Sequence, residues 1–174
     1  MQDVMIDFET FGTGFNSVVV QVGACFFDRK TGEIGKTFIH NIAVDSSVDQ
    51  GFEMDGDTIY WWLQQDIVAI ESILAHPRLS VDVVFHALND FIEGSEAVWS
   101  HATFDFVIMM NHFKRLNIVP LVSFRTARDI RTLVDIANID VGSYKGTGTK
   151  HNALDDCKFQ VKYVVDGLNN LSCL

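Results

Sequence analysis

The stretch VMIDFETFGTG, residues 4–14, combines the apolar pattern of a buried strand with two acidic residues near its end. Side chains that are two residues apart on a strand point to the same side of the sheet. Asp7 and Glu9 therefore place two carboxylates a few ångströms apart on one face. Two like charges this close are costly to bury unless a positive charge lies between them. The stretch predicts a bound cation, and a metal ion is the first candidate.

The composition of the chain is that of a globular protein. It has 174 residues, of which 48% are hydrophobic and 21% are charged. This length suits one domain with a proper core, and no linker or repeat divides it, so we expect a single domain over residues 1–174. The three cysteines (Cys25, Cys157 and Cys173) have no paired spacing and predict neither a disulfide framework nor a zinc site.

The hydropathy of the chain bears on its location. A strand pattern begins almost at the first residue, with no basic segment and apolar run of the kind that forms a signal peptide. No stretch has the roughly 18 continuous apolar residues that a membrane span needs. We therefore expect a cytoplasmic protein with no membrane contact.

The net charge of −10 argues against a protein that binds nucleic acid mainly through a basic surface. The positive charges are distributed unevenly, because nine of the thirteen lysines and arginines lie between Lys114 and Lys162. The second half of the chain could therefore still present a local basic track. Part of the negative charge is expected to belong to a metal-binding cluster.

The order of the expected elements predicts the fold class. Apolar and β-branched runs predict strands, and apolar residues at helical spacing between capping residues and glycines predict helices. The expected strands are residues 3–8, 17–28, 36–42, 97–101 and 123–129, and the expected helices are residues 55–66, 81–94, 104–117, 130–137 and 152–171. Three strands joined by hairpins and followed by strand–helix alternation predict an α/β fold, a mixed sheet with helices on its faces.

Acidic residues and a histidine recur at three junctions of this pattern. Asp7 and Glu9 end the first strand, Asp105 starts a helix after a short strand, and His151 and Asp156 begin the last helix. Junctions after strands are where α/β folds usually gather their chemistry. Each residue alone has a simpler explanation: a solvated strand edge, an acid favoured by the helix dipole, or a surface histidine. These explanations do not account for the combination.

Together these segments resemble a known family. The stretches IDFETFG (6–12), SHATFDF (100–106) and HNALDDCKFQ (151–160) look like the three motifs of the DnaQ-like, or DEDDh, 3′–5′ exonucleases. Those motifs are a strand ending in D-x-E-[TS]-x-G, an Asp at the start of a helix, and H-x4-D. The match spans nearly the whole chain in the right order. The chain looks similar to small stand-alone bacteriophage and bacterial enzymes, the DexA-like group and its exoribonuclease-like relatives.

The resemblance implies a fold, an activity and a set of site residues. The fold would be ribonuclease H-like: three antiparallel strands, then parallel strands, with helices on both faces. The enzyme would hydrolyse phosphodiester bonds from the 3′ end of single-stranded nucleic acid and release 5′-mononucleotides, with DNA favoured over RNA. The implied metal ligands are Asp7, Glu9, Asp105 and Asp156, and the implied general base is His151. Some relatives pair, so a homodimer is a further expectation.

The chemistry of hydrolysis explains this residue set. Two divalent cations about 3.5–4 Å apart can activate a water, align its attack and relieve charge on the phosphate. Carboxylates without cysteine suit two Mg²⁺ or Mn²⁺ ions better than zinc. A histidine, whose ordinary pKa is about 6.5, can take the proton of the attacking water near neutral pH.

Five further residues are candidates for contact with the substrate. They are Thr10, Phe11, Trp61, Phe104 and Lys150. Thr10 matches the family position that holds the terminal nucleotide, and the aromatic residues could stack on a base. Trp61 and Trp62 are adjacent on one helix and point in different directions, so one is expected in the core. Burial in the core is the simpler explanation for each aromatic residue alone, and a solvated charge is the simpler explanation for Lys150.

Three other functions deserve comparison. A ribonuclease H-like endonuclease also clusters acids on this fold, but the spacing of His151 and Asp156 fits the exonuclease better. An inactive nucleic-acid-binding module would need a lost ligand, and all five positions are occupied. A nucleotide-binding protein using the GTGT loop matches neither GxxxxGK[ST] nor GxGxxG after a strand.

Overall fold

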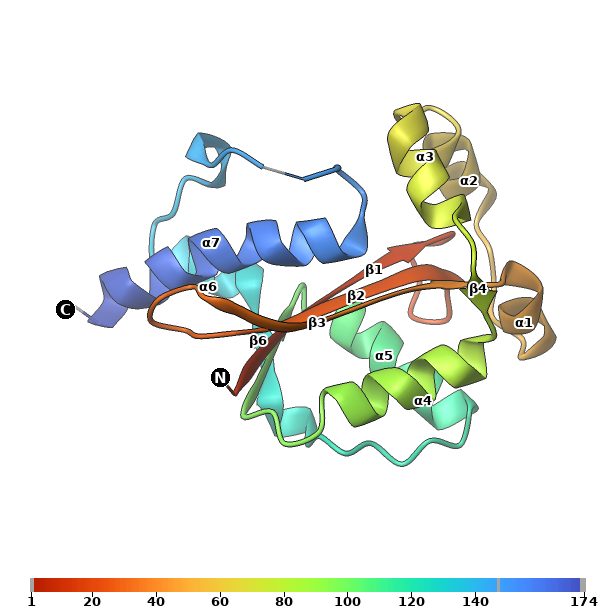
Figure 1. Cartoon of the computed structure of the whole chain (residues 1–174), viewed down its shortest axis with the longest axis horizontal. Helices are drawn as coiled ribbons and strands as arrows, with labels where there is room; N and C mark the ends of the chain where they lie inside the picture. The colour runs from red at the N-terminus through yellow and green to blue at the C-terminus, as the bar shows by residue number, and fades with distance from the viewer. Residues whose placement is uncertain (1, 147, 173–174) are drawn as a thin grey trace.

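The computed structural model describes residues 2–146 and 148–172. Within them the chain forms one mixed sheet of six strands in the order β4-β3-β2-β1-β5-β6 (Figure 1). The strands are β1 (Asp3–Thr10), β2 (Val19–Phe27), β3 (Ile34–Ile42), β4 (Arg78–Leu79), β5 (Ala97–Ser100) and β6 (Ala127–Asp129).

The pairing of the strands follows the predicted topology. The strands β1, β2 and β3 are antiparallel neighbours, whereas β5 runs parallel to β1 and β6 runs parallel to β5. The prediction of three antiparallel strands followed by parallel ones is confirmed. The short strand β4 adds a parallel edge beside β3, which the sequence did not predict.

Helices cover both faces of the sheet, as predicted (Figure 1). The helices are α1 (Val44–Asp49), α2 (Gly56–Trp62), α3 (Ile67–Leu74), α4 (Val81–Phe91), α5 (Asp105–Arg115), α6 (Ile130–Ile136) and α7 (Ala153–Ser172). In Figure 1, α4 and α5 lie below the sheet and α7 lies above it, while α2 and α3 stand at the edge where β1 ends. No helix in the described part of the chain is long and apolar enough to cross a membrane.

Strand β1 divides the core into two clusters. Val4, Ile6 and Phe8 belong to the cluster that includes α4 and α5. Met5 belongs to the cluster that includes α6 and α7. Because side chains alternate along a strand, Asp7 must point to the same face as Met5, toward α7. A strand covered on both faces explains the unbroken apolar run in the sequence.

Three parts of the structure differ from the predicted elements. Helices α1 and α3 were not predicted, because each is short and most of its stability must come from packing rather than from a sequence pattern. The last strand was expected from residue 123, but Phe124–Thr126 forms a 3₁₀ turn. Ser123 caps this turn by accepting a hydrogen bond from the Arg125 N–H, so the strand begins only at Ala127.

Candidate active site

The end of β1 brings the first two acids to an irregular edge of the sheet. The register between β1 and β2 shifts between Glu9 and Thr10. Such a bulge re-aims side chains and is common beside active sites. Strand β5 is parallel to β1, so its carboxyl end opens at the same edge, and helix α5 begins there with Asp105.

The start of α7 reaches this edge because Gly23 has no side chain. Gly23 on β2 pairs with Asp7, and a Cβ placed on it would lie 2.3 Å from the carbonyl carbon of Ala153. Only glycine permits the backbone of α7 to lie so close to the strand. The Ala153 N–H also donates to Gln21 Oε1 (2.8 Å), which fixes the helix start on β2. Sequence reasoning assigned no role to Gly23.

Hydrogen bonds hold two of the acids in defined orientations. Asp105 accepts from the backbone N–H of Phe8 (3.2 Å) through one oxygen and from that of His101 (3.1 Å) through the other. Asp7 Oδ1 accepts from Gln160 Nε2 (2.8 Å). Gln160 was not predicted as a site residue, although it follows Asp156 by four residues on α7 and therefore lies on the same helix face.

Glu9, His151 and Asp156 form a group of side chains that could hold a metal ion. Each offers one ligand atom, and these atoms all lie within 4.8 Å of one another. The backbone N–H of His151 donates to Asp156 Oδ2 (3.0 Å). The structure thus brings residues from the first strand, the loop before α7 and α7 itself to one point.

Burial is the main cause of the raised pKa values of the four acids, and repulsion from the other site acids adds to it at Asp7 and Glu9. Burial raises the pKa of Asp7 well above its ordinary value, and repulsion from Asp105, Glu9 and Asp156 adds to this. Burial, with repulsion from Asp156 and Asp105, raises the pKa of Glu9 to about 8. Burial also raises the pKa of Asp105 to about 7 and raises that of Asp156, although backbone N–H groups oppose both shifts. The four carboxylates therefore share one electrostatic field.

The residues at this edge fit divalent metal ions. A cluster of buried carboxylates that repel one another is stabilised by a cation, and hard oxygen ligands are those that Mg²⁺ and Mn²⁺ prefer. Gln160 Oε1 is buried without a hydrogen-bond partner in the described residues, so the only partner of this amide in the site is Asp7. The donor set supports a metal centre but does not define the number of ions.

A largely apolar cavity of about 450 Å³ opens beside these acids. Its lining includes Glu9, Thr10, Trp61, Trp62 and Phe104, so three of the five predicted substrate contacts lie on it. Trp62 is buried, and its Nε1 donates to the Thr10 carbonyl (2.9 Å), while Trp61 is 43% exposed. The prediction that one of these two tryptophans lies in the core is confirmed, because Trp62 is buried and Trp61 is exposed to solvent.

The other two predicted contacts occupy different positions. Phe11 packs edge-on against Trp62 with ring centroids 6.5 Å apart, and it is not among the residues that line this cavity. Lys150 is exposed beside His151, where the two residues border a cavity of about 580 Å³ that reaches the start of α3. The His151 ring contacts Trp61 and Trp62, with centroid distances of 5.0 and 5.8 Å.

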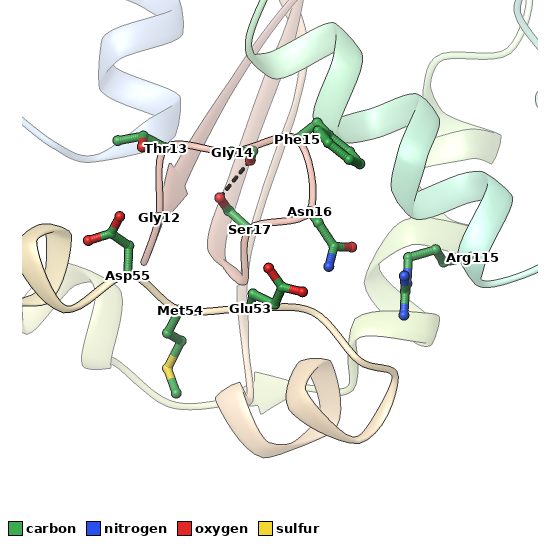
Figure 2. Close-up of a pocket in the computed structure, with 10 residues that line it drawn as sticks. All are labelled: Gly12, Thr13, Gly14, Phe15, Asn16, Ser17, Glu53, Met54, Asp55 and Arg115. Carbon is green, nitrogen blue, oxygen red and sulfur yellow. Dashed lines mark hydrogen bonds between the residues drawn. The ribbon is translucent and has the colours of Figure 1, made fainter.

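A further cavity of about 480 Å³ follows the turn after Glu9 (Figure 2). It shares Gly12 and Thr13 with the apolar cavity, and its lining is polar and apolar in about equal parts. In Figure 2 the loop is closed by the hydrogen bond from Ser17 Oγ to the Gly14 carbonyl (2.6 Å), and Arg115 lies on the far side of Glu53 from Asp55. Because this cavity carries charges of both signs, it does not select an anion or a cation.

Nearly the whole chain matches a known protein family. The family model described as the 3′–5′ exoribonuclease Rv2179c-like domain matches residues 2–167. No similar protein is found among curated sequences at a significant level.

Several solved structures with a similar fold are nucleases. Exonuclease X in complex with 5′ overhanging duplex DNA has a TM-score of 0.55 and 16% identity, with 98% of this chain and 93% of that chain covered. The nuclease domain of 3′hExo, a DEDDh family member bound to rAMP, has a TM-score of 0.62 and 14% identity, with coverages of 97% and 92%. E. coli exonuclease I with an oligonucleotide has a TM-score of 0.62 and 13% identity, but only 40% of that chain is covered. At these identities the likeness concerns the fold.

Proposed function

Because the chain belongs to the family of 3′–5′ exoribonuclease Rv2179c-like domains, we propose that it removes nucleotides one at a time from the 3′ end of single-stranded RNA. The family confirms the DnaQ-like resemblance, and the chain is a hydrolytic 3′–5′ exonuclease with a ribonuclease H-like fold. The family description moves the proposed substrate from DNA to RNA. The preference for DNA stays an untested alternative.

One observation supports the proposed active centre most directly. Residues from three separate segments meet at one edge of the sheet, and the ligand atoms of Glu9, His151 and Asp156 lie within 4.8 Å of one another. Asp7 and Asp105 share the electrostatic field of these acids. A structural role alone does not require a histidine and buried acids at one point, whereas hydrolysis does.

The proposed roles follow from these positions. Asp7, Glu9, Asp105 and Asp156 would hold two Mg²⁺ or Mn²⁺ ions, which when bound supply an activated water and neutralise charge on the phosphate. His151 would take the proton of the attacking water on its imidazole. The apolar cavity would receive the terminal nucleoside, with the exposed Trp61 ring available for base stacking.

The test uses an RNA oligonucleotide labelled at its 5′ end, with a DNA of the same sequence in parallel. We expect Mg²⁺- or Mn²⁺-dependent stepwise shortening, with 5′-mononucleotides released and RNA degraded faster than DNA. Asp7→Ala is expected to lower the rate by about 10³-fold or more, and His151→Ala by about 10²–10⁴-fold. Full activity in either folded variant would exclude these roles. Cleavage of a circular single strand would instead indicate an endonuclease.

Three broader expectations remain predictions from the sequence. They are a single domain over residues 1–174, a location in the cytoplasm and assembly into a homodimer. Light scattering of the purified protein tests the last of these directly.

A further inference from the structure

We propose that Asp155 positions the loop that carries His151 and thereby sets the orientation of the base. This inference rests on the proposed function, in which His151 accepts the proton of the attacking water. Asp155 precedes the proposed metal ligand Asp156 on α7. In the sequence it is simply an acid in the first turn of a helix, which the helix dipole favours.

The two neighbouring aspartates bind the same loop at different places. Asp155 Oδ2 accepts from the Thr149 N–H (3.0 Å), and Asp156 Oδ2 accepts from the His151 N–H (3.0 Å). Asp156 belongs to the group that could hold a metal ion, whereas Asp155 does not. The carboxylate of Asp156 that accepts from the His151 N–H is therefore one that a metal ion would also use. The hydrogen bond that Asp155 accepts from the Thr149 N–H is independent of the metal.

Close packing at Gly148 supports this role. A Cβ on Gly148 would lie 2.4 Å from Asp155 Cγ and 2.5 Å from Asp155 Oδ2. The loop therefore passes directly over this carboxylate, at a distance that only glycine allows. The Asp155 side chain thus fills the space beneath the loop as well as bonding to it.

The backbone of His151 needs such support. Its φ angle is 59°, in the left-handed region that residues other than glycine rarely adopt. A residue in this region persists only when its surroundings hold it there, and such strain concentrates at functional sites. The hydrogen bonds that the Thr149 and His151 N–H groups donate to the two aspartates hold the chain in this conformation.

Asp155 is itself held in place through both its backbone and its side chain. Its backbone N–H donates to Asn152 Oδ1 (3.1 Å), and Asn152 Nδ2 donates to Ser72 Oγ (2.7 Å), which ties the helix start to α3. Lys158 Nζ lies 3.6 Å from Asp155 Oδ1, the oxygen that faces away from the loop bond. Asp155 is thus a fixed support rather than a mobile surface acid.

The test compares Asp155→Ala with Asp155→Asn, Gly148→Ala and the control Asp82→Ala. Asp82 is an exposed first-turn acid on α4, far along the chain from this site, and it lies 3.6 Å from His86 as Asp155 lies 3.6 Å from Lys158, so its variant reproduces the loss of a helix-dipole interaction and of one surface ion pair. We expect Asp155→Ala and Gly148→Ala to lower kcat by about 10- to 100-fold, since small misplacements of a catalytic group have effects of this size. KM should stay within about threefold of the wild-type value. Asp155→Asn keeps an acceptor oxygen, so its kcat should stay near that of the wild type.

A double-variant measurement separates positioning from general stability. Asp155→Ala should add no further loss of kcat in the His151→Ala background, because the residue acts through His151. The increase in melting temperature on adding Mg²⁺ should be the same in Asp155→Ala as in wild type. An equal loss in both backgrounds, or an unchanged kcat in Asp155→Ala and Gly148→Ala, would overturn the inference. If His151→Ala itself kept full activity, the proposed function would fail instead.

Discussion

The two ends of strand β1 solve the same electrostatic problem in different ways. Asp3 at the start of the strand is buried, and it accepts hydrogen bonds from the Arg29 guanidinium and from Trp99 Nε1 (2.8 Å). Asp7 and Glu9 at the other end are also buried, but no ion pair within the described residues reaches either of them. The burial is similar, and the partners differ.

This is the difference that we expect between a structural acid and a proposed metal ligand. Burying a charge is costly unless a partner of opposite sign and hydrogen bonds accompany it. At Asp3 the chain supplies the cation itself, and the carboxylate joins β1 to the turn after β2. At Asp7 and Glu9 the chain supplies further acids, which raise the pKa of both residues. A buried acid without its own cation leaves that place for a ligand.

The largest expected effect is on enzymatic activity, which should depend on the acids at one end of β1 and not on Asp3 at the other. Glu9→Gln should lower the rate of nucleotide release by about 10³-fold, because it removes a proposed metal ligand and a charge from the cluster. Asp3→Asn should leave kcat of the folded enzyme within about twofold. Both variants are measured with the same labelled RNA at saturating Mg²⁺. A comparable loss in Asp3→Asn would remove the distinction between the two ends.

His112, a buried base on α5, extends the comparison to a group that has no ion pair within the described residues. The His112 ring lies between those of Phe52 and Phe85, with centroid distances of 3.8 and 4.3 Å, and its Nδ1 is 2.9 Å from the Ile108 carbonyl. Burial lowers the pKa of His112 to about 4. The unfolded chain therefore binds the proton more tightly, so stability is complete above pH 6.5 and is lost as the pH falls toward 4.

The difference between these pKa values corresponds to at most about 3 kcal/mol of unfolding free energy. His112→Phe should remove this part of the pH dependence between pH 6.5 and 4. Urea unfolding of both proteins at several pH values measures this effect as the difference in unfolding free energy between the wild type and the variant at each pH. A parallel pH dependence in the two proteins would show that His112 does not titrate in this range.

Loss of the structural ion pair should destabilise the fold. Asp3→Asn is expected to lower the unfolding free energy by about 2 kcal/mol, less than for a fully buried pair because Arg29 is about half exposed. Urea unfolding at pH 7 tests this value. Unchanged stability would mean that the hydrogen bond from Trp99, which an asparagine can keep, holds this end of the strand alone.

The smallest expected effect is an increase in the unfolding free energy, and it depends on whether metal is bound. The pKa of Glu9 is raised to about 8 in the folded protein, so its contribution to stability is present below about pH 4.5 and is lost as the pH rises through 8. Glu9→Gln should therefore raise the unfolding free energy of the metal-free protein at pH 8.5 by about 1 kcal/mol. Added Mg²⁺ should stabilise the wild type more than the variant. A variant that is less stable in both conditions would contradict this account.

Sequence patterns were most informative where a local rule applied. The alternation along β1 placed Asp7 and Glu9 on one face, and the three motifs pointed to the residues that the structure gathers at one edge. They did not predict α3, whose short apolar segment has no strong pattern of its own. Phe11 stays a predicted substrate contact, and the structure adds only that its ring packs edge-on against Trp62, a neighbour in space that no local pattern indicates.

The sequence alone determined the fold class and the identity of the acidic residues and histidine, because side-chain periodicity and motif spacing are properties of local chain geometry. Only the tertiary structure decided how these residues meet. Gly23 lets α7 lie directly on β2, Gln160 reaches Asp7 across the core, and Asp155 holds the loop before His151. These contacts join residues that are distant in sequence or depend on backbone approach, and no local pattern encodes such distances.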